Sequence, residues 1–334
     1  MSIPKEPDIS SGEVVETDEE LYWAACRVRK IVMKDMILSL LGRALNPLHL
    51  FKAARLQWNR RANRHAFVDA QLALVNKVLP SDFLHYGYFD NPDCQPEDMK
   101  LSDISRAQHR YADLLIEQIA NPTDPVLDVG CGMGGISRML HSRGFSPTAL
   151  TPDRLQASHI AHTQPDVPVL RCKLERLPVA EHKQKYGTVL TSESLQYLRL
   201  EQALPIIDAV LKPGGRWIAS DYFQRHPSDD DTCHNWEEFQ SLLPRRGWRI
   251  THQRDITKNV IPMLSYVNMW AEHAGKPLAH MTVLRLQRKQ PGLHYLLEGV
   301  IDQLNNTMNN NFLRIDPAWF QRHRLYMMLV IERA

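Results

Sequence analysis

An apolar strand pattern that ends in an acid and a glycine-rich turn constrains this chain more than any other feature. It reads VLDVGCGMGG over residues 126–135. Glycine adopts positive φ and lets the backbone approach a ligand closely, and a helix that begins after such a turn points free amide donors at whatever binds there. The segment therefore predicts the nucleotide-cofactor turn of an α/β protein.

The turn alone leaves two cofactor classes open. Gly130, Gly132 and Gly135 also satisfy the G-x-G-x-x-G pattern of dinucleotide enzymes, and Asp153 follows about twenty residues later, where that pattern places an acid. A nicotinamide-dependent oxidoreductase is therefore an alternative. A second segment, LKPGGRWI at residues 211–218, lies about eighty residues downstream, which fits three intervening β/α units. The oxidoreductase hypothesis accounts poorly for that segment.

Together, the two segments resemble class I methyltransferases that depend on S-adenosyl-L-methionine (SAM). The resemblance runs from about Val126 to Tyr222 and includes the strand end VLTSESLQY at residues 189–197. Two features precede the turn, the aromatic loop FLHYGYF at residues 83–89 and a helix that carries Gln108. They resemble the small-molecule and lipid methyltransferases of the tocopherol, sarcosine/dimethylglycine and cyclopropane-synthase type.

This resemblance implies a set of SAM contacts. The glycines line the methionine moiety, Asp128 holds its ammonium group, and the aromatic loop with its following helix closes over the cofactor. Ala149 and Lys173 stand where relatives place acids against the ribose and the adenine, which leaves Asp153 and Glu175 as substitutes. The expected cofactor-binding residues are Tyr86, Tyr88, Gln108, Asp128, Gly130, Gly132, Gly134, Asp153, Glu175 and Ser194.

Methyl transfer is an in-line displacement in which a nucleophile attacks a methyl group activated by positive sulfur. Positioning supplies much of the rate, and a protonated nucleophile also needs a base. Glu193 follows the fourth predicted strand, at the edge where doubly wound sheets bind ligands, so we expect it to face the reacting centre. The candidate bases are His85, His280 and His294. Cyclopropane synthases carry a Glu-His pair where this chain has Gln196 and Tyr197, which argues against alkene cyclopropanation.

Composition argues against several other functions. With 43% hydrophobic and 23% charged residues the chain is typical of a globular protein, and a net charge of +2 gives nucleic-acid binding no support. No apolar run suits a signal peptide or a bilayer span, and the five cysteines form no C-x-x-C pair, so we expect a cytoplasmic protein without a metal centre. Basic helices predicted over residues 21–64 leave peripheral membrane contact or a solvated face open.

The chain divides into five predicted segments. Residues 1–20, with seven acids and one lysine, are predicted to form a disordered tail, and residues 21–120 a helical region closing over the cofactor. Residues 121–256 alternate strand and helix, which predicts an α/β fold with a doubly wound, mostly parallel Rossmann-like sheet. By the resemblance, that sheet has seven strands. Residues 257–320 are predicted to be a helical substrate cap, inserted before an antiparallel last strand within residues 321–334.

The expected function is the transfer of a methyl group from SAM to a small-molecule or lipid-like acceptor. Two alternatives remain at this point. One is the nicotinamide-dependent oxidoreductase, and the other is a catalytically inactive, methyltransferase-like binding protein, which the two replaced adenosine acids suggest.

Overall fold

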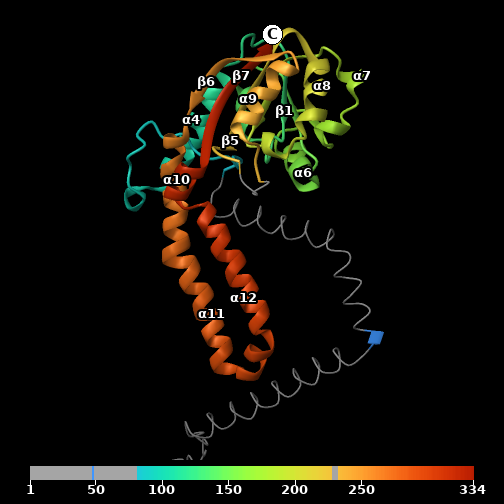
Figure 1. Ribbon diagram of the computed structural model, residues 1–334. Coiled ribbons are helices and arrows are strands. Elements are labelled where there is room, and N and C mark those ends of the chain that lie inside the picture. The colour runs from blue at the N-terminus through green and yellow to red at the C-terminus, as the bar shows by residue number, and fades with distance from the viewer. Residues whose placement is uncertain (1–46, 49–80, 228–231) are drawn as a thin grey trace, which may run out of the picture. The chain divides into compact units, whose positions relative to one another are not determined.

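The computed structural model describes residues 47–48, 81–227 and 232–334 (Figure 1). The chain separates into two units, residues 1–74 and 75–334, and every strand of the sheet belongs to the second. The predicted acidic tail over residues 1–20 and nearly all of the predicted basic helices over residues 21–64 lie outside the described residues.

A single seven-stranded sheet organises the second unit. Its strand order is β3-β2-β1-β4-β5-β7-β6, and β7 runs antiparallel to both of its neighbours while β1 to β5 pair in parallel. The strands are β1 (Val126–Val129), β2 (Pro147–Leu150), β3 (Val169–Leu170), β4 (Tyr186–Ser192), β5 (Leu211–Gln224), β6 (Trp248–Asp255) and β7 (Arg324–Arg333). The predicted doubly wound, mostly parallel sheet with an antiparallel last strand is confirmed.

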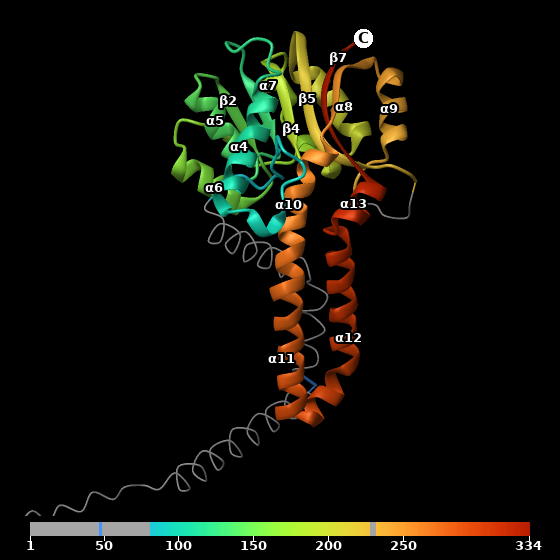
Figure 2. The same ribbon diagram turned by 90° about the vertical axis from the view of Figure 1, so that its left-hand side faces the viewer.

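Helices cover both faces of the sheet (Figure 2). The helices and short turns that precede β6 are η1 (Pro96–Asp98), α4 (Leu101–Ile116), α5 (Gly135–Ser142), α6 (Arg154–Thr163), η2 (Leu174–Arg176), α7 (Val179–His182), η3 (Leu195–Tyr197), α8 (Leu200–Val210) and α9 (Trp236–Arg245). Because successive strand residues point to opposite faces, Val126 packs with α4 and α5 while Leu127 packs with α8 and α9. The sheet therefore has two apolar cores, one on each side.

The segment between β6 and β7 is helical, as predicted. It consists of α10 (Thr257–Trp270), the π-helical turn η4 (Ala271–Gly275), α11 (Lys276–Lys289), α12 (Pro291–Arg314) and α13 (Pro317–His323). Val260 and Leu264 of α10 are buried in the core that contains α4. Among the described residues, no helix is both long enough and apolar enough to cross a membrane.

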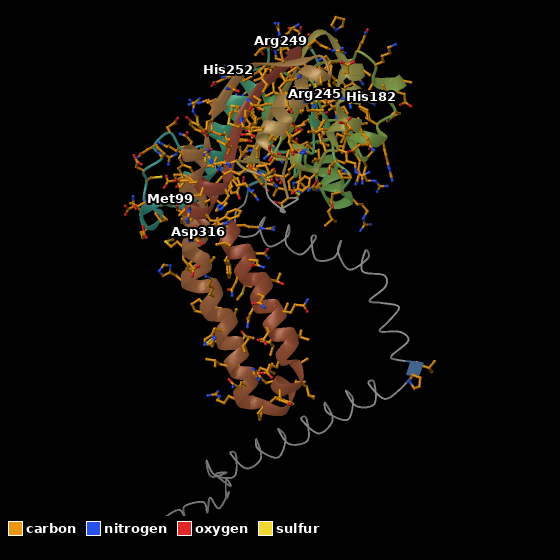
Figure 3. All side chains as sticks on the ribbon, in the orientation of Figure 1. Met99, His182, Arg245, Arg249, His252 and Asp316 are labelled. Atoms are coloured by element: carbon orange, nitrogen blue, oxygen red, sulfur yellow. The ribbon has the colours of Figure 1, made fainter. Side chains whose placement is uncertain are left out.

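The direction of α11 and α12 differs from that expected of a cap that lies over the sheet. The two helices form an antiparallel hairpin that projects from the sheet (Figures 1 and 2), and neither contains a buried residue. Asp316 lies at the base of the hairpin (Figure 3), where its side chain accepts the backbone N–H of Trp319 at 2.6 Å and caps α13. Only the end of α12 and the short α13 return to the sheet.

Candidate active site

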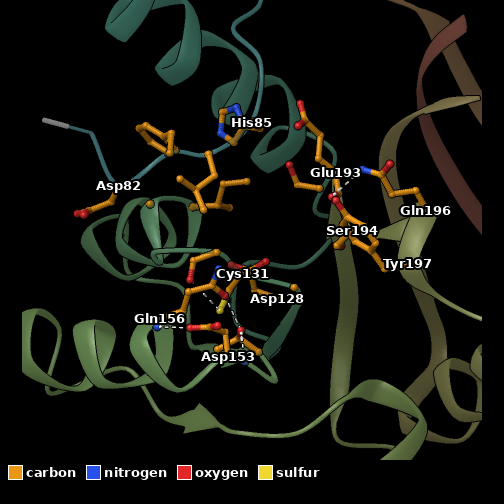
Figure 4. A pocket seen from close by; sticks show the side chains of 18 of the residues that line it. Asp82, His85, Asp128, Cys131, Asp153, Gln156, Glu193, Ser194, Gln196 and Tyr197 are labelled. Carbon is orange, nitrogen blue, oxygen red and sulfur yellow. Dashed lines mark hydrogen bonds between the residues drawn. The ribbon is translucent and has the colours of Figure 1, made fainter. Parts of the chain in front are cut away.

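A cavity of about 410 Å³ opens at the carboxyl ends of β1 and β4 (Figure 4). Its walls come from residues 82–86, the turn after β1, the start of α6 and the turn after β4. Figure 4 shows Asp153 and Gln156 at one end, Glu193 at the other and Asp128 between them. Small-molecule sites usually enclose roughly 300–1,000 Å³, and doubly wound sheets bind ligands at this edge.

The glycine turn after β1 forms one wall of this cavity. Gly130 has a φ of +72°, and a Cβ there would lie 2.3 Å from the Cβ of Ser194. Gly132 has a φ of +56°, and a Cβ there would lie 3.2 Å from a side-chain carbon of Leu84. Gly134 is outside the lining and packs toward α6 instead. The first glycine therefore permits close packing against the β4 turn, and the second keeps space for a ligand.

Two polar side chains lie under the turn. Asp128 lines the cavity, and one of its carboxylate oxygens accepts the hydroxyl of Ser137 at 2.6 Å. Burial raises the pKa of Asp128 to about 6, although that hydrogen bond lowers it. Ser194 also lines the cavity, but its hydroxyl donates to the carbonyl of Val129 at 2.6 Å. A ligand cation beside Asp128 would offset the cost of burying this carboxylate, whereas Ser194 mainly holds two turns together.

The two acids that the sequence analysis expects as substitutes for the usual adenosine contacts lie in different places. Asp153 lines the cavity, and its Oδ1 caps α6 by accepting the backbone N–H groups of Leu155 and Gln156 at 2.8 and 2.9 Å. Glu175 does not line the cavity, because η2 directs it toward the backbone N–H of Arg199, which it accepts at 3.3 Å. The structure thus corrects the expectation for Glu175. Gln156 is a cavity-lining polar group that the sequence analysis missed.

The aromatic loop before α4 contributes fewer direct contacts than expected. Tyr86 lines the cavity, but Tyr88 and Gln108 do not. Tyr88 is buried with its hydroxyl against Arg254. Gln108 is buried in α4, where its amide donates to the carbonyls of Phe83 at 3.3 Å and His85 at 2.9 Å. These two residues support the loop but do not face the cavity. The structure therefore differs from the expectation that they lie beside the cofactor.

His85 is a buried, neutral imidazole in the cavity wall. Its Nδ1 lies 2.7 Å from the carbonyl of Tyr86, which can only accept, so Nδ1 carries the hydrogen and Nε2 is left as an acceptor. The ring stacks on Tyr111 with a centroid distance of 4.3 Å, and Nε2 has no partner among the described residues. Burial lowers the pKa of His85 to about 4, which makes it a weak base at neutral pH.

Glu193 is the carboxylate at the end of the cavity opposite Asp153. It directly follows β4 and has a φ of +49°, which is strained for a residue with a side chain. Its Oε1 accepts the backbone N–H of Tyr86 at 2.6 Å and the hydroxyl of Tyr326 at 2.5 Å. Burial raises the pKa of Glu193 to about 7, with both hydrogen bonds opposing that shift. The structure places Glu193 on the wall of this cavity, and its expected role at the reacting centre stays a prediction.

Another acid, Asp221, is buried three residues before the end of β5 and was missed by the sequence analysis. It accepts the backbone N–H of Gln196 at 3.1 Å and that of Tyr222 at 2.8 Å. Burial, and then repulsion from Glu193, raises the pKa of Asp221 to about 8. Asp221 is outside the cavity lining and holds the turn that presents Gln196. Its only sequence signal is an acid within an apolar strand pattern.

The other two candidate bases lie elsewhere. His280 is exposed on α11 and His294 is half-buried on α12, and neither lines the cavity. The expectation that they act at the reacting centre is corrected, because the hairpin that carries them projects from the sheet. Within the described part of the chain, no three His, Cys, Asp or Glu side chains are grouped as metal ligands.

A second cavity, of about 390 Å³, adjoins the first. The two share four lining residues, which are Tyr86, Gln196, Tyr197 and Tyr222. The opposite wall of the second cavity comes from the end of α12, from α13 and from the start of β7, and consists of Arg314, Ile315, Trp319, Phe320 and Arg324. The helical segment before β7 therefore does reach the site, through its last helix.

The strand order, the glycine turn after β1 and the cavity at the carboxyl edge define a class I methyltransferase. A family model described as a methyltransferase domain matches residues 126–215. The chain is 30% identical over 201 residues to the fatty-acid O-methyltransferase of Mycolicibacterium smegmatis, a match that covers 56% of this chain and 69% of that protein. This protein belongs to the family of SAM-dependent methyltransferases.

Other relatives agree on the class and the fold. The chain is 28% identical over 147 residues to the uncharacterized methyltransferase YodH of Bacillus subtilis, which covers 39% of this chain and 62% of YodH, less than two thirds of its length. Geranyl diphosphate C-methyltransferase from Streptomyces coelicolor, solved with Mg²⁺, geranyl diphosphate and S-adenosyl-L-homocysteine, has a TM-score of 0.56 at 17% identity, covering 78% and 93% of the two chains.

A putative sarcosine dimethylglycine methyltransferase from Galdieria sulphuraria has a TM-score of 0.58 at 13% identity, with 78% of this chain and 97% of that chain covered. At such low identity these two structures establish the shared fold. SAM is the cofactor of the family, and membership in it removes the nicotinamide-dependent alternative.

Proposed function

We propose that this enzyme methylates a small apolar or lipid-like acceptor that binds in the second cavity. The observation that carries the proposal is the pair of adjoining cavities with a shared wall of aromatic and amide side chains. One cavity offers the contacts that SAM needs, and the other is enclosed by the helix that lies just before β7. Fatty acids and geranyl diphosphate, named for two relatives, are acceptors with long apolar chains.

The residues of the first cavity fit SAM. Asp128 supplies a buried carboxylate with one oxygen bonded to Ser137, which suits the cofactor's ammonium group. Gly132 leaves room beside the turn, and Asp153 with Gln156 offers polar groups for the ribose. The methyl donor is cationic, so a cavity lined by carboxylates and aromatic rings matches its charge.

The second cavity suits an acceptor with a substantial apolar part. Phe320 is buried, and its ring lies 6.3 Å from that of Tyr86 and 6.0 Å from that of Tyr222. Trp319 and Ile315 add apolar surface beside it. An acceptor held there would present its reactive atom across the shared wall toward the first cavity.

When bound, SAM supplies a methyl carbon on positive sulfur, and the acceptor's lone pair forms the new bond as the carbon–sulfur bond breaks. The chain positions the two partners in line across the shared wall. For a protonated acceptor such as an alcohol or a phenol, Glu193 takes the proton on its carboxylate. A pKa of about 7 suits a base at neutral pH, because an appreciable fraction is ionised and still basic. An acceptor that is already anionic needs no base.

The test measures binding and turnover separately. We expect S-adenosyl-L-homocysteine to bind the purified protein in calorimetry and NADH not to bind, and Asp128→Asn to weaken that binding. Transfer of labelled methyl from SAM to a panel of fatty acids, isoprenoids and phenols then identifies the acceptor. Phe320→Ala should raise the KM for the acceptor and leave the affinity for S-adenosyl-L-homocysteine unchanged. Binding without turnover on any apolar acceptor would favour the inactive binding protein and contradict the proposal.

A further inference from the structure

The α11–α12 hairpin exposes a large amount of apolar side chain. Eight of its apolar residues are between 47% and 78% exposed, namely Leu278, Met281, Leu284, Tyr295, Leu296, Val300, Leu304 and Leu313. A scattered exposed leucine needs no explanation, but an apolar set gathered on one projecting element usually marks an interaction surface. The two helices contact each other, yet that contact buries none of their residues fully.

Part of this set is arranged as a stripe. Leu296, Val300 and Leu304 follow one another at four-residue spacing, so they lie along one face of α12. The stripe begins at the tip of the hairpin, where Tyr295 and Leu296 are 74% and 78% exposed. Tyrosine beside leucine at an exposed tip is a composition that suits the boundary between water and lipid.

The charge at the tip has one sign. From Lys276 to Leu297 the sequence contains four basic residues and no acid, and three of the four, Arg285, Arg288 and Lys289, lie in the last five positions of α11. Arg285 and Arg288 are exposed, and neither forms an ion pair with another described residue. The acids of α12, Glu298 and Asp302, come only after its first two turns.

We propose that the tip of this hairpin docks on an anionic lipid surface. Arg285 and Arg288 would lie among the acidic headgroups while Tyr295 and Leu296 enter the interface. A second copy of the chain is a less suitable occupant, because pairing two α11 helices would bring basic side chains together with no acid on that helix to balance them. This surface is distinct from the basic region predicted over residues 21–64.

The geometry limits what such docking does. A helix of 24 residues is about 36 Å long, and the end of α12 that lines the second cavity is opposite the tip. Docking by the tip would therefore tether the methyltransferase near a membrane without pressing the cavity against it. The inference stands whether or not the proposed acceptor is correct.

The test uses the full chain and sedimenting vesicles of phosphatidylcholine, with or without phosphatidylglycerol. We expect the protein to sediment with the anionic vesicles, to remain in solution with the neutral ones, and to be released by high salt. Arg285→Glu with Arg288→Glu, and separately Leu296→Ser with Val300→Ser, should each weaken binding by roughly tenfold or more. Leu313→Ser, a half-exposed leucine at the other end of α12, is the matched control and should bind as the wild type does.

Two outcomes would overturn the proposal. If both tip variants sediment as the wild type does, the hairpin is not the docking element. If the wild type ignores anionic vesicles and forms a concentration-dependent dimer in light scattering that the Leu296→Ser and Val300→Ser changes abolish, the stripe is an interface between copies of this chain. Circular dichroism and the binding of S-adenosyl-L-homocysteine, measured for each variant, establish that it remains folded.

Discussion

The hydroxyl of Tyr326 on β7 donates a 2.5 Å hydrogen bond to Oε1 of Glu193 at the end of β4. The hydroxyl of Tyr326 also lies 3.1 Å from the hydroxyl of Tyr111 on α4. Side chains from the end of β4, from β7 and from α4 therefore meet at this carboxylate. Since a hydrogen bond to the ionised form favours it, Tyr326 keeps the pKa of Glu193 lower than burial alone would set it.

Tyr326→Phe should therefore shift the pH dependence of methylation. Without the phenol, the pKa of Glu193 rises further above about 7, because burial is less opposed. The acidic limb of kcat/KM for a protonated acceptor should move upward by about one pH unit, since a hydrogen bond to a charged group contributes about 1.5 kcal/mol. Binding of S-adenosyl-L-homocysteine serves as the control and should not change. An unmoved limb would show that Glu193 does not titrate in the reaction.

Glu193→Gln should separate acceptors by their protonation state. The glutamine carbonyl can still accept from Tyr86 and Tyr326, but the proton-accepting carboxylate is lost. With a phenol or alcohol acceptor we expect a loss of about 100-fold in kcat, the lower end of the usual contribution of a general base. A carboxylate acceptor should be methylated at nearly the wild-type rate. Equal losses on both acceptors would assign Glu193 a positioning role instead.

Gly132→Ala should abolish most cofactor binding. The added Cβ would stand at a φ of +56° and 3.2 Å from Leu84, inside the cavity that the turn leaves open. Gly144→Ala is the matched control, because Gly144 has a φ of +81° but nothing within 4 Å of its added Cβ. The control should lose about 1–2 kcal/mol of stability and keep its affinity for S-adenosyl-L-homocysteine. Similar affinity losses in both variants would mean that backbone strain, and not cavity space, explains the effect.

The buried acids should make the protein less stable as the pH rises. Burial raises the folded-state pKa of Glu193 to about 7 and that of Asp221 to about 8, above their unfolded values near 4. Between about pH 4 and pH 8 the folded state then holds more protons than the unfolded state, so this contribution to stability is largest at the acidic end and is lost toward pH 8.

Asp221→Asn should flatten that dependence, because it removes an acid whose pKa the fold raises to about 8. Urea unfolding at pH 5 and pH 8 measures the difference, which should be smaller in the variant than in the wild type. Glu97→Gln changes an exposed acid in η1 and should leave the difference as it is in the wild type. If Asp221→Asn keeps the wild-type pH dependence, Asp221 is not held protonated by the fold.

The sheet and part of the cavity lining could be predicted from the sequence because both depend on local patterns. A glycine turn after an apolar strand has few alternative folds, and with the family resemblance it indicated Asp128, Gly130 and Gly132, which line the cavity, and Gly134, which does not. Glu193 could be placed because strand ends share one edge of a parallel sheet. Side-chain direction was harder, and the buried Gln108 turned out to support the aromatic loop from behind.

The features that could not be predicted from the sequence depend on long-range packing. Tyr326 and Glu193 are 133 positions apart, and the raised pKa of Asp221 comes from burial and then from repulsion by Glu193, neither of which a local pattern contains. The apolar periodicity of residues 276–314 predicted helices correctly. It could not indicate that they pair with each other and leave the sheet, because the same pattern fits a helix packed on a sheet.

The position of β7 has a consequence for how the protein is made. This strand comes after the hairpin in the chain but lies between β5 and β6 in the sheet. Until a ribosome has synthesised residues 324–333, β6 has no strand partner and β5 has an open edge, which invites wrong pairing. Tyr326 arrives with the same strand, so Glu193 gains the hydrogen bond from the Tyr326 hydroxyl only as the sheet closes. Completion of the sheet and completion of the site are thus a single, late event in the life of each new chain.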